Sequence, residues 1–183
     1  IGTDFEVQED TLHEDSYQAS LNIASGYAAA DFDANARLKL IAGVRYEHAS
    51  QALANGSRYA IAGVRADISR NDNDVLPTGN AVYALTSNTN LRAAYSYTLA
   101  RPRFRELAPF LYFDYIRRRS LSGNPNLATT HIHNADVRWE YFPGQDEVIA
   151  ASAFGKRFEQ PIEQVLSDSE SNASFRNATS GNL

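Results

Sequence analysis

The chain has 183 residues, and 17 Lys and Arg against 22 Asp and Glu give a net charge of −5. This acidic balance argues against nucleic acid as a partner, because a polyanion binder carries a basic surface. The absence of cysteine excludes disulfides, thiolate metal sites and a cysteine nucleophile. No run of 18 apolar residues predicts a transmembrane helix, which leaves transmembrane β-strands open.

Four stretches alternate between apolar and polar residues, and this period of two predicts half-buried β-strands. A fifth stretch, residues 147–158, predicts a strand with two mixed faces. The apolar faces of the four are Ala19, Leu21, Ile23, Ser25, Tyr27 and Ala29; Leu38, Leu40, Ala42, Val44 and Tyr46; Leu91, Ala93, Tyr95, Tyr97 and Leu99; and Ala135, Val137, Trp139 and Tyr141.

The connections between these strands alternate in length. Short polar turns are predicted at 33–36, 87–90 and 143–146, and long loops at 51–74, 101–127 and 160–176. Long strands with short turns at one end and long loops at the other are typical of an outer-membrane barrel. A soluble sandwich would place a turn every 8–12 residues or so. The string "IAGVR" occurs at 41–45 and again at 61–65, which we interpret as chance similarity between two strands.

The predicted faces differ in a way that favours lipid on the apolar side. Charged residues such as Arg45, Glu47 and Arg138 follow the polar faces, as a wet lumen allows. Tyr46 and Trp139 lie near the ends of the apolar faces, where aromatic side chains mark membrane interfaces. Trp139 precedes a short turn, which fits a girdle at the periplasmic rim. The alternatives are a complete small β-barrel or a soluble β-sheet acting as a binding or structural module without transport.

The sequence offers no catalytic constellation, and no enzyme activity, cofactor or metal is predicted. His131 and His133 share a face of one predicted strand, but without a carboxylate or cysteine partner in register we interpret them as ordinary strand surface. Asp72 and Asp74 lack the glycine and glutamate spacing of a calcium loop, and a solvated turn is the interpretation.

The long loop at 101–127 is the predicted place of ligand contact. Aromatic rings give stacking surface and arginines give bidentate contacts to anions, so the candidate ligand residues are Tyr112, Tyr115, Arg117, Arg118 and Arg119. The alternative is that the aromatics form an outer girdle and the arginines bind lipopolysaccharide phosphates or line the wall. Arg101, Arg103 and Arg105 alternate with other residues, which predicts that all three point the same way, into the lumen.

Longer motifs are more specific than this periodicity. The segment "VLPTGNAVYALTSNTNLRAAYSYTLARPRFRELAPF" is followed by "GNPNLATTHIHNADVRWEYFPGQDEVIAASAFGKRFEQPIEQ". Together with "GYAAADFDANARLKLIAGVRYEH" upstream, these stretches resemble the middle-to-late barrel of TonB-dependent receptors over residues 17–164. The motifs "ARPRFREL" and "GNPNL" carry most of the resemblance.

The resemblance implies an all-β fold, an antiparallel hairpin meander of about six to seven transmembrane strands within a larger barrel of about 22 strands. It implies import of a scarce nutrient across the bacterial outer membrane, such as siderophore-iron, a vitamin, an oligosaccharide or a peptide. The implied partners are the TonB complex, a plug domain of the same chain, the small-molecule substrate and outer-membrane lipid. The plug is also what Arg101, Arg103 and Arg105 would face. Residues 1–183 are expected to be a partial barrel that lacks the plug, the TonB-contacting box and the closing strand.

Overall fold

The structure is a computed structural model that describes residues 17–55, 67–109, 111–114, 116–166 and 172–183. Its elements are β1 (Tyr17–Asn35), β2 (Leu38–Asn55), β3 (Ile68–Thr86), β4 (Thr89–Ala100), α1 (Phe104–Leu107), β5 (Leu111–Asp114), β6 (Arg119–Ser122), β7 (Thr130–Tyr141), β8 (Ile149–Glu159), β9 (Ile162–Leu166), β10 (Asn172–Asn177) and β11 (Ser180–Asn182). No helix within the described ranges is long and apolar enough to cross a membrane.

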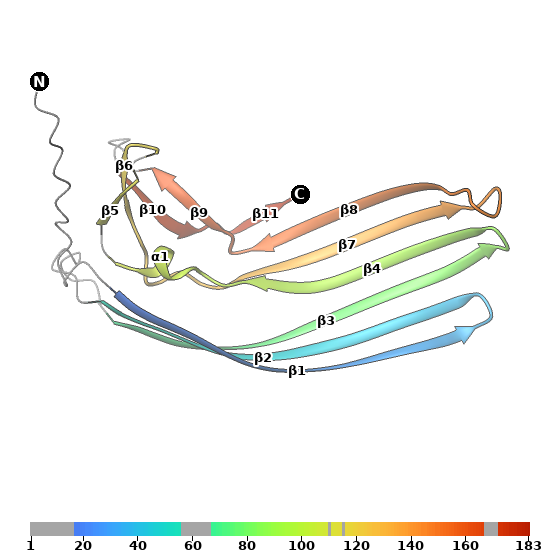
Figure 1. Cartoon of the computed structure of the whole chain (residues 1–183), viewed down its shortest axis with the longest axis horizontal. Coiled ribbons are helices and arrows are strands. Elements are labelled where there is room, and N and C mark those ends of the chain that lie inside the picture. Colours follow the sequence, from blue (N-terminus) through green and yellow to red (C-terminus); the bar gives the residue numbers. More distant parts are fainter. Residues whose placement is uncertain (1–16, 56–66, 110, 115, 167–171) are drawn as a thin grey trace, which may run out of the picture.

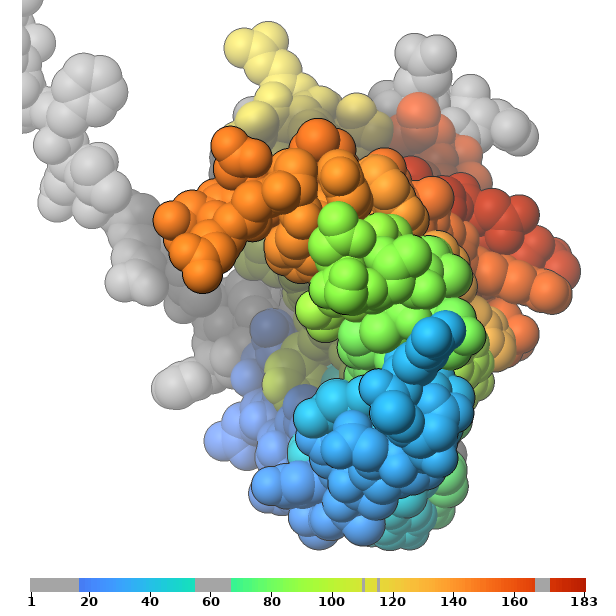
Figure 2. Space-filling view, turned by 90° about the vertical axis from the view of Figure 1, so that its right-hand side faces the viewer, coloured from blue at the N-terminus to red at the C-terminus, as the bar shows by residue number. Residues whose placement is uncertain are grey.

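Seven strands form one antiparallel sheet in the order β1-β2-β3-β4-β7-β8-β11. The predicted meander of six to seven strands is therefore confirmed. All three short turns lie at one end of the sheet, as Figure 1 shows. Seen from that end in Figure 2, the turns of the blue, green and orange hairpins follow one another up the sheet. Polar side chains close the turns, for example Asn35 Oδ1, which accepts a hydrogen bond from the Arg37 N–H at 2.9 Å.

The opposite end of the sheet differs from the predicted long loops. β2 continues to Asn55 and β3 begins at Ile68, so much of the predicted loop at 51–74 is strand. The second "IAGVR", at 61–65, lies outside the described residues. The other two predicted loops contain a second sheet, of four strands in the order β5-β6-β10-β9, together with α1. In Figure 1 this smaller sheet, here called the loop sheet, lies at the end of the large sheet away from the short turns.

One face of the large sheet is apolar and exposed between the short turns and Tyr46. The register places Tyr46 opposite Val75, and these side chains are 48% and 57% exposed. Across β4 and β7 the same face carries Tyr95 and Val137. The nine residues from Leu38 to Tyr46 match the ~9–11 residues of a transmembrane strand. The opposite face carries Arg45 and Glu47 on β2 and Arg138 and Glu140 on β7, so the predicted faces of these strands are confirmed.

The predicted apolar face of β1 is wrong. The register places Tyr27 opposite Arg45 and Ile23 opposite Ala49, on the charged side of the sheet. Arg45 Nη2 also donates to Ser25 Oγ at 2.8 Å. The reason lies further along the strands, where polarity changes sides. Beyond Tyr46, the inner face of β2 becomes apolar and buried, with Ala49 2% and Leu53 1% exposed. Alternation alone does not reveal such an inversion.

The hydrophobic core therefore lies at the long-loop end. Within the described residues, the other buried apolar side chains are Pro102, Leu107, Ala108, Pro109, Leu121, Leu127 and Ala173, all from the segments that follow β4 or precede β11. Gln51, between Ala49 and Leu53 on the inner face of β2, donates its Nε2 to the Pro102 carbonyl at 3.0 Å. The inverted part of the strands thus forms the wall against which the excursion from Arg101 to Leu127 begins.

Candidate ligand-binding site

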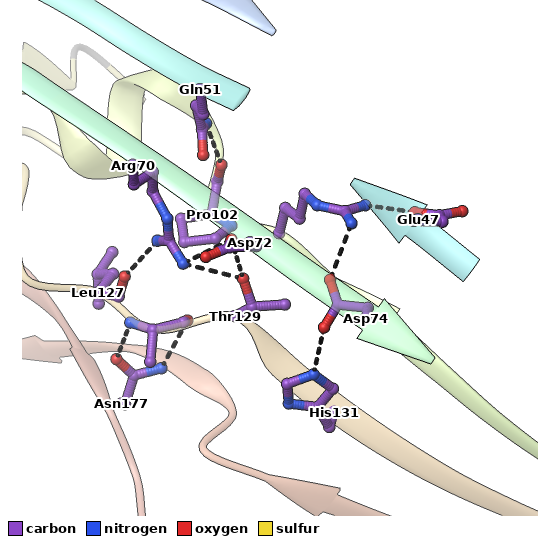
Figure 3. Close-up of polar contacts among 12 residues, drawn as sticks. Glu47, Gln51, Arg70, Asp72, Asp74, Pro102, Leu127, Thr129, His131 and Asn177 are labelled. Carbon is purple, nitrogen blue, oxygen red and sulfur yellow. Dashed lines mark hydrogen bonds and ion pairs between the residues drawn. The ribbon is translucent and has the colours of Figure 1, made fainter. Parts of the chain in front are cut away.

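A cluster of buried charges joins the excursion to the inner face of the sheet. Arg101 Nη1 lies 2.9 Å from Glu47 Oε2, and Nη2 lies 3.0 Å from Asp74 Oδ2. Figure 3 labels Glu47 and Asp74, whose dashed lines meet at this guanidinium. The three side chains are 10%, 12% and 8% exposed. The pairing of β3 with β4 ends at Thr78 and Ser96, so Asp74 lies on the part of β3 that has separated from β4. Its carboxylate is therefore open to contacts from both sides of this gap between the strands.

A second arginine holds the end of the excursion. Arg70 Nη1 donates to the Leu127 carbonyl at 2.6 Å, and Nη2 pairs with Asp72 Oδ2 at 2.8 Å. Thr129 Oγ1 donates to the same carboxylate oxygen at 3.1 Å. The side chain of Asn177, from β10, accepts from and donates to the backbone of Ala128. We call Glu47, Arg70, Asp72, Asp74 and Arg101 the rim cluster, because they hold both ends of the excursion at the long-loop end (Figure 3).

The rim cluster corrects the interpretation of Asp72 and Asp74, which lie within β3 and not in a solvated turn. The two histidines also differ from ordinary strand surface. His131 Nε2 lies 3.0 Å from Asp74 Oδ1, within hydrogen-bond distance of this carboxylate. His133 lies between Tyr95 Oη, at 2.9 Å, and Glu159 Oε1, at 3.3 Å.

The two motifs of the sequence contact each other at α1. The backbone N–H of Arg103 donates to Glu106 Oε2 at 2.9 Å, which caps the helical turn. The Asn124 N–H donates to the Glu106 carbonyl at 2.6 Å. A Cβ on Gly123 would lie 2.2 Å from the Ala108 carbonyl oxygen, so only glycine allows this approach. "ARPRFREL" and "GNPNL" therefore form one packed unit.

A groove of about 630 Å³ opens beside this unit, on the loop sheet. Arg105 Cζ lies 4.8 Å from the centroid of the Tyr112 ring, a cation–π geometry. The groove is lined by Arg103, Arg105, Glu106, Tyr112, Phe113, Asp114, Ile116, Arg117, Leu121, Gln164 and Phe175.

The groove favours an anion. Its carboxylates already accept hydrogen bonds from the backbone: Glu106 from Arg103 N–H, and Asp114 from the N–H groups of Ile116 and Arg117 at 3.0 and 3.1 Å. The Arg117 N–H bond is the main cause that lowers the pKa of Asp114. Burial raises the pKa of the Tyr112 phenol, which keeps it a neutral donor. The three arginines outnumber the two carboxylates that line the groove.

The structure brings together some of the predicted residues. Tyr112 and Arg117 line the groove along with Arg103 and Arg105. Arg118 lies exposed in the turn after β5 with φ of 51°, and Arg119 belongs to β6; neither lines the groove. Tyr115 lies outside the described residues.

The extended backbone on which the lumen-facing prediction for Arg101, Arg103 and Arg105 relied is not present, and that these arginines face the lumen or plug stays a prediction. α1 begins at Phe104, so the backbone is helical where the alternation needs it extended. The residues differ in surroundings as well, since Arg101 is bound in the rim cluster while Arg105 faces the Tyr112 ring in the groove.

The predictions missed the rim cluster. Its signal is present in the sequence, because Arg70, Asp72 and Asp74 alternate in "SRNDNDV" and would share one face of a strand. This alternation was not interpreted as a strand because the same residue types are typical of a polar turn.

Known proteins support the same architecture. The family model described as TonB dependent receptor-like, beta-barrel matches residues 4–182. A double mutant of the Serratia marcescens hemophore receptor HasR, solved with its hemophore HasA and heme, superposes with a TM-score of 0.70 and 17% identity over 88% of this chain and 30% of that one.

Two further solved structures are similar. The Pseudomonas aeruginosa ferric enterobactin receptor PfeA, an R480A mutant in complex with enterobactin, has a TM-score of 0.58 and 15% identity over 90% of this chain and 32% of that one. The FrpB iron transporter from Neisseria meningitidis has a TM-score of 0.60 and 14% identity over 92% and 23%. The chain thus spans between 23% and 32% of the length of these three solved proteins. A search of curated proteins found no match.

Proposed function

Because the chain belongs to the TonB-dependent receptor family, we propose that it forms part of the wall and outer mouth of an importer that takes up a scarce nutrient. Members of this family are transporters and not enzymes, and their barrels lie in the bacterial outer membrane. The observation that carries the proposal is the match of the barrel model to residues 4–182. The sheet supports it, because an exposed apolar face lies opposite a charged one.

We further propose that the whole receptor contains about 22 strands and a plug domain, and that the TonB complex supplies the energy. An open sheet with unpaired edges is not tolerated in lipid, which supports a closed barrel around this segment. The charged inner face, with Arg45, Arg138 and Glu140, suits contact with a polar plug and water.

The proposed substrate is an anionic iron chelate or heme. Structures with the same fold bind enterobactin or heme, and the groove offers Arg103, Arg105 and Arg117 beside Tyr112. Guanidinium groups give bidentate contacts to carboxylate and phenolate oxygens, and the aromatic rings add stacking surface. Tyr115, Arg118 and Arg119 remain proposed contacts of lower rank, because the described part of the groove is built without them.

Uptake by the whole receptor tests this function. Cells that depend on the receptor should take up labelled ferric enterobactin or heme only while TonB and the proton gradient are intact. Replacing Arg105 and Arg117 together by alanine should weaken binding of that ligand by about 100-fold or more, since two charge-assisted contacts of ~1.5–3 kcal/mol each sum to ~3–6 kcal/mol.

Arg176→Gln is the matched control, because it removes one positive charge from β10 of the same loop sheet at an exposed side chain that does not line the groove. Binding equal to wild type is expected. Energy-independent uptake would refute the transport proposal, and loss of binding by Arg176→Gln equal to that of the double variant would refute the groove as the ligand site.

A further inference from the structure

We propose that Arg101 is a positioning residue whose double ion pair fixes the start of the excursion, and with it the groove, against β2 and β3. Its guanidinium uses Nη1 for Glu47 and Nη2 for Asp74, so two strands determine the orientation of one planar group. Arg101 would then set the affinity of the groove for its ligand, a consequence that rests on the function proposed above.

The burial of the cluster makes the anchor strong. Arg101, Glu47 and Asp74 are each about nine-tenths buried, and charges interact more strongly where water is excluded. Removing one partner from such a site leaves an uncompensated buried charge, which costs more than the pair itself contributes. Without the guanidinium, the two carboxylates would face each other across β2 and β3, which the register places directly opposite.

A short covalent path leads from this anchor to the groove. Pro102 follows Arg101, and its ring fixes φ while its carbonyl accepts from the buried Gln51. Arg103 comes next, lines the groove and begins the cap of α1 through its N–H bond to Glu106. One rigid residue thus separates the anchor from the first residue of the groove.

The far wall of the groove is attached to the same unit. Asn124 donates its backbone N–H to Glu106 and its Nδ2 to the Phe175 carbonyl at 3.0 Å, and both of these partners line the groove. At the end of the excursion, Arg70 holds the Leu127 carbonyl. Asp74 and Arg70 lie four positions apart on β3, so one strand anchors both ends of the excursion.

Hydrogen exchange of the full-length receptor tests the anchor without any ligand. In Arg101→Gln, exchange of the Leu107, Ala108 and Asn124 amides should accelerate about tenfold or more, because local opening becomes easier. The exchange rates of β7 and β8 amides on the short-turn side of the rim cluster should not change. Arg101→Lys keeps the charge but reaches one carboxylate at a time, so its rates should fall between those of Arg101→Gln and wild type.

Arg92→Gln is the control, because it breaks an ion pair of the same sheet, with Glu140 at 2.8 Å, that holds no part of the excursion. The anchor is refuted if Arg101→Gln exchanges like wild type, if Arg101→Lys does so, or if Arg92→Gln accelerates the same three amides equally.

Titration of the same variants with ferric enterobactin and with heme tests the consequence for binding. Arg101→Gln should weaken the probe that wild type binds by about tenfold, with Arg92→Gln unchanged. If Arg101→Gln exchanges faster but binds the probe with wild-type affinity, the positioning role is refuted. Arg101 would then anchor the excursion without setting the affinity of the groove. If wild type binds neither probe, the proposed substrate fails, and the exchange result still decides whether Arg101 anchors the excursion.

Discussion

The roles of single residues in the rim cluster depend on the strands and segments around them. Arg70, Asp72 and Asp74 look like part of a polar loop, yet they lie on one face of β3 and hold the excursion. Asp74 is buried, and Arg70 and Asp72 are partly buried, so their charges need partners, because an unpaired buried charge is strongly unfavourable. Those partners, Arg101 and Leu127, are distant in sequence, so the sequence alone did not predict the cluster.

Gly123 is a second residue whose role depends on a distant segment. Gly123→Ala places a Cβ 2.2 Å from the Ala108 carbonyl oxygen and 2.7 Å from its nitrogen, so α1 and the loop must separate. Overpacking of this kind costs ~1–3 kcal/mol. We expect faster hydrogen exchange of the Asn124 amide, whose bond to Glu106 closes the same contact.

Gly26→Ala is the control for this substitution, because a Cβ at Gly26 meets nothing within 4 Å. Its exchange rates in the loop should equal those of wild type. Unchanged exchange in Gly123→Ala would show that the loop relaxes without cost and that the close contact is unimportant.

At the scale of elements, the strands could be predicted and the excursion could not. Alternation and turn residues gave β2, β4, β7 and the three hairpins, because each of these depends on neighbours in sequence. α1 lies within the predicted long loop at 101–127, where no helix was predicted; its helical turn is closed by the Arg103–Glu106 cap and packed by Gly123. β5, β6, β9 and β10 are short and pair partly with distant segments, as β6 does with β10.

The turn between β5 and β6 should respond to acid. The pKa of Asp114 is lowered in the folded loop, chiefly by the Arg117 N–H, so its ionised form stabilises the turn. This contribution is fully present above the usual value of 3.8 and is lost as the pH falls through the lower folded value. Protection of the Ile116 and Arg117 amides, corrected for intrinsic exchange, should therefore decrease between pH 6 and a pH well below 3.8.

Asp114→Asn separates charge from hydrogen bonding, because its amide oxygen still accepts from these N–H groups but does not titrate. Its protection should be the same at both pH values. An equal decrease in this variant, or no decrease in wild type, would show that another group controls the turn.

At the scale of the whole molecule, the strands change polarity along their length, and the change separates the exposed apolar face from the end that supports the loop sheet. Between the short turns and Tyr46, apolar side chains face outward and charged ones inward. Above Tyr46, Ala49 and Leu53 face inward and are buried, and His48, on the outer face, bonds to Asn73 at 2.9 Å. The same strands thus face lipid between the short turns and Tyr46, and they support the loop sheet beyond Tyr46.

A nitroxide scan along β2 in the full-length receptor, reconstituted into liposomes, tests this account most directly. Labels replace residues 40 to 54 one at a time, and their collisions with lipid-soluble oxygen and with a water-soluble nickel chelate are measured. We predict that residues 40, 42, 44 and 46 collide with oxygen, that 48, 50 and 52 collide with the chelate, and that 49, 51 and 53 are shielded from both. Chelate access at 42 and 44, or outward oxygen access that continues unchanged to residue 54, would contradict the account.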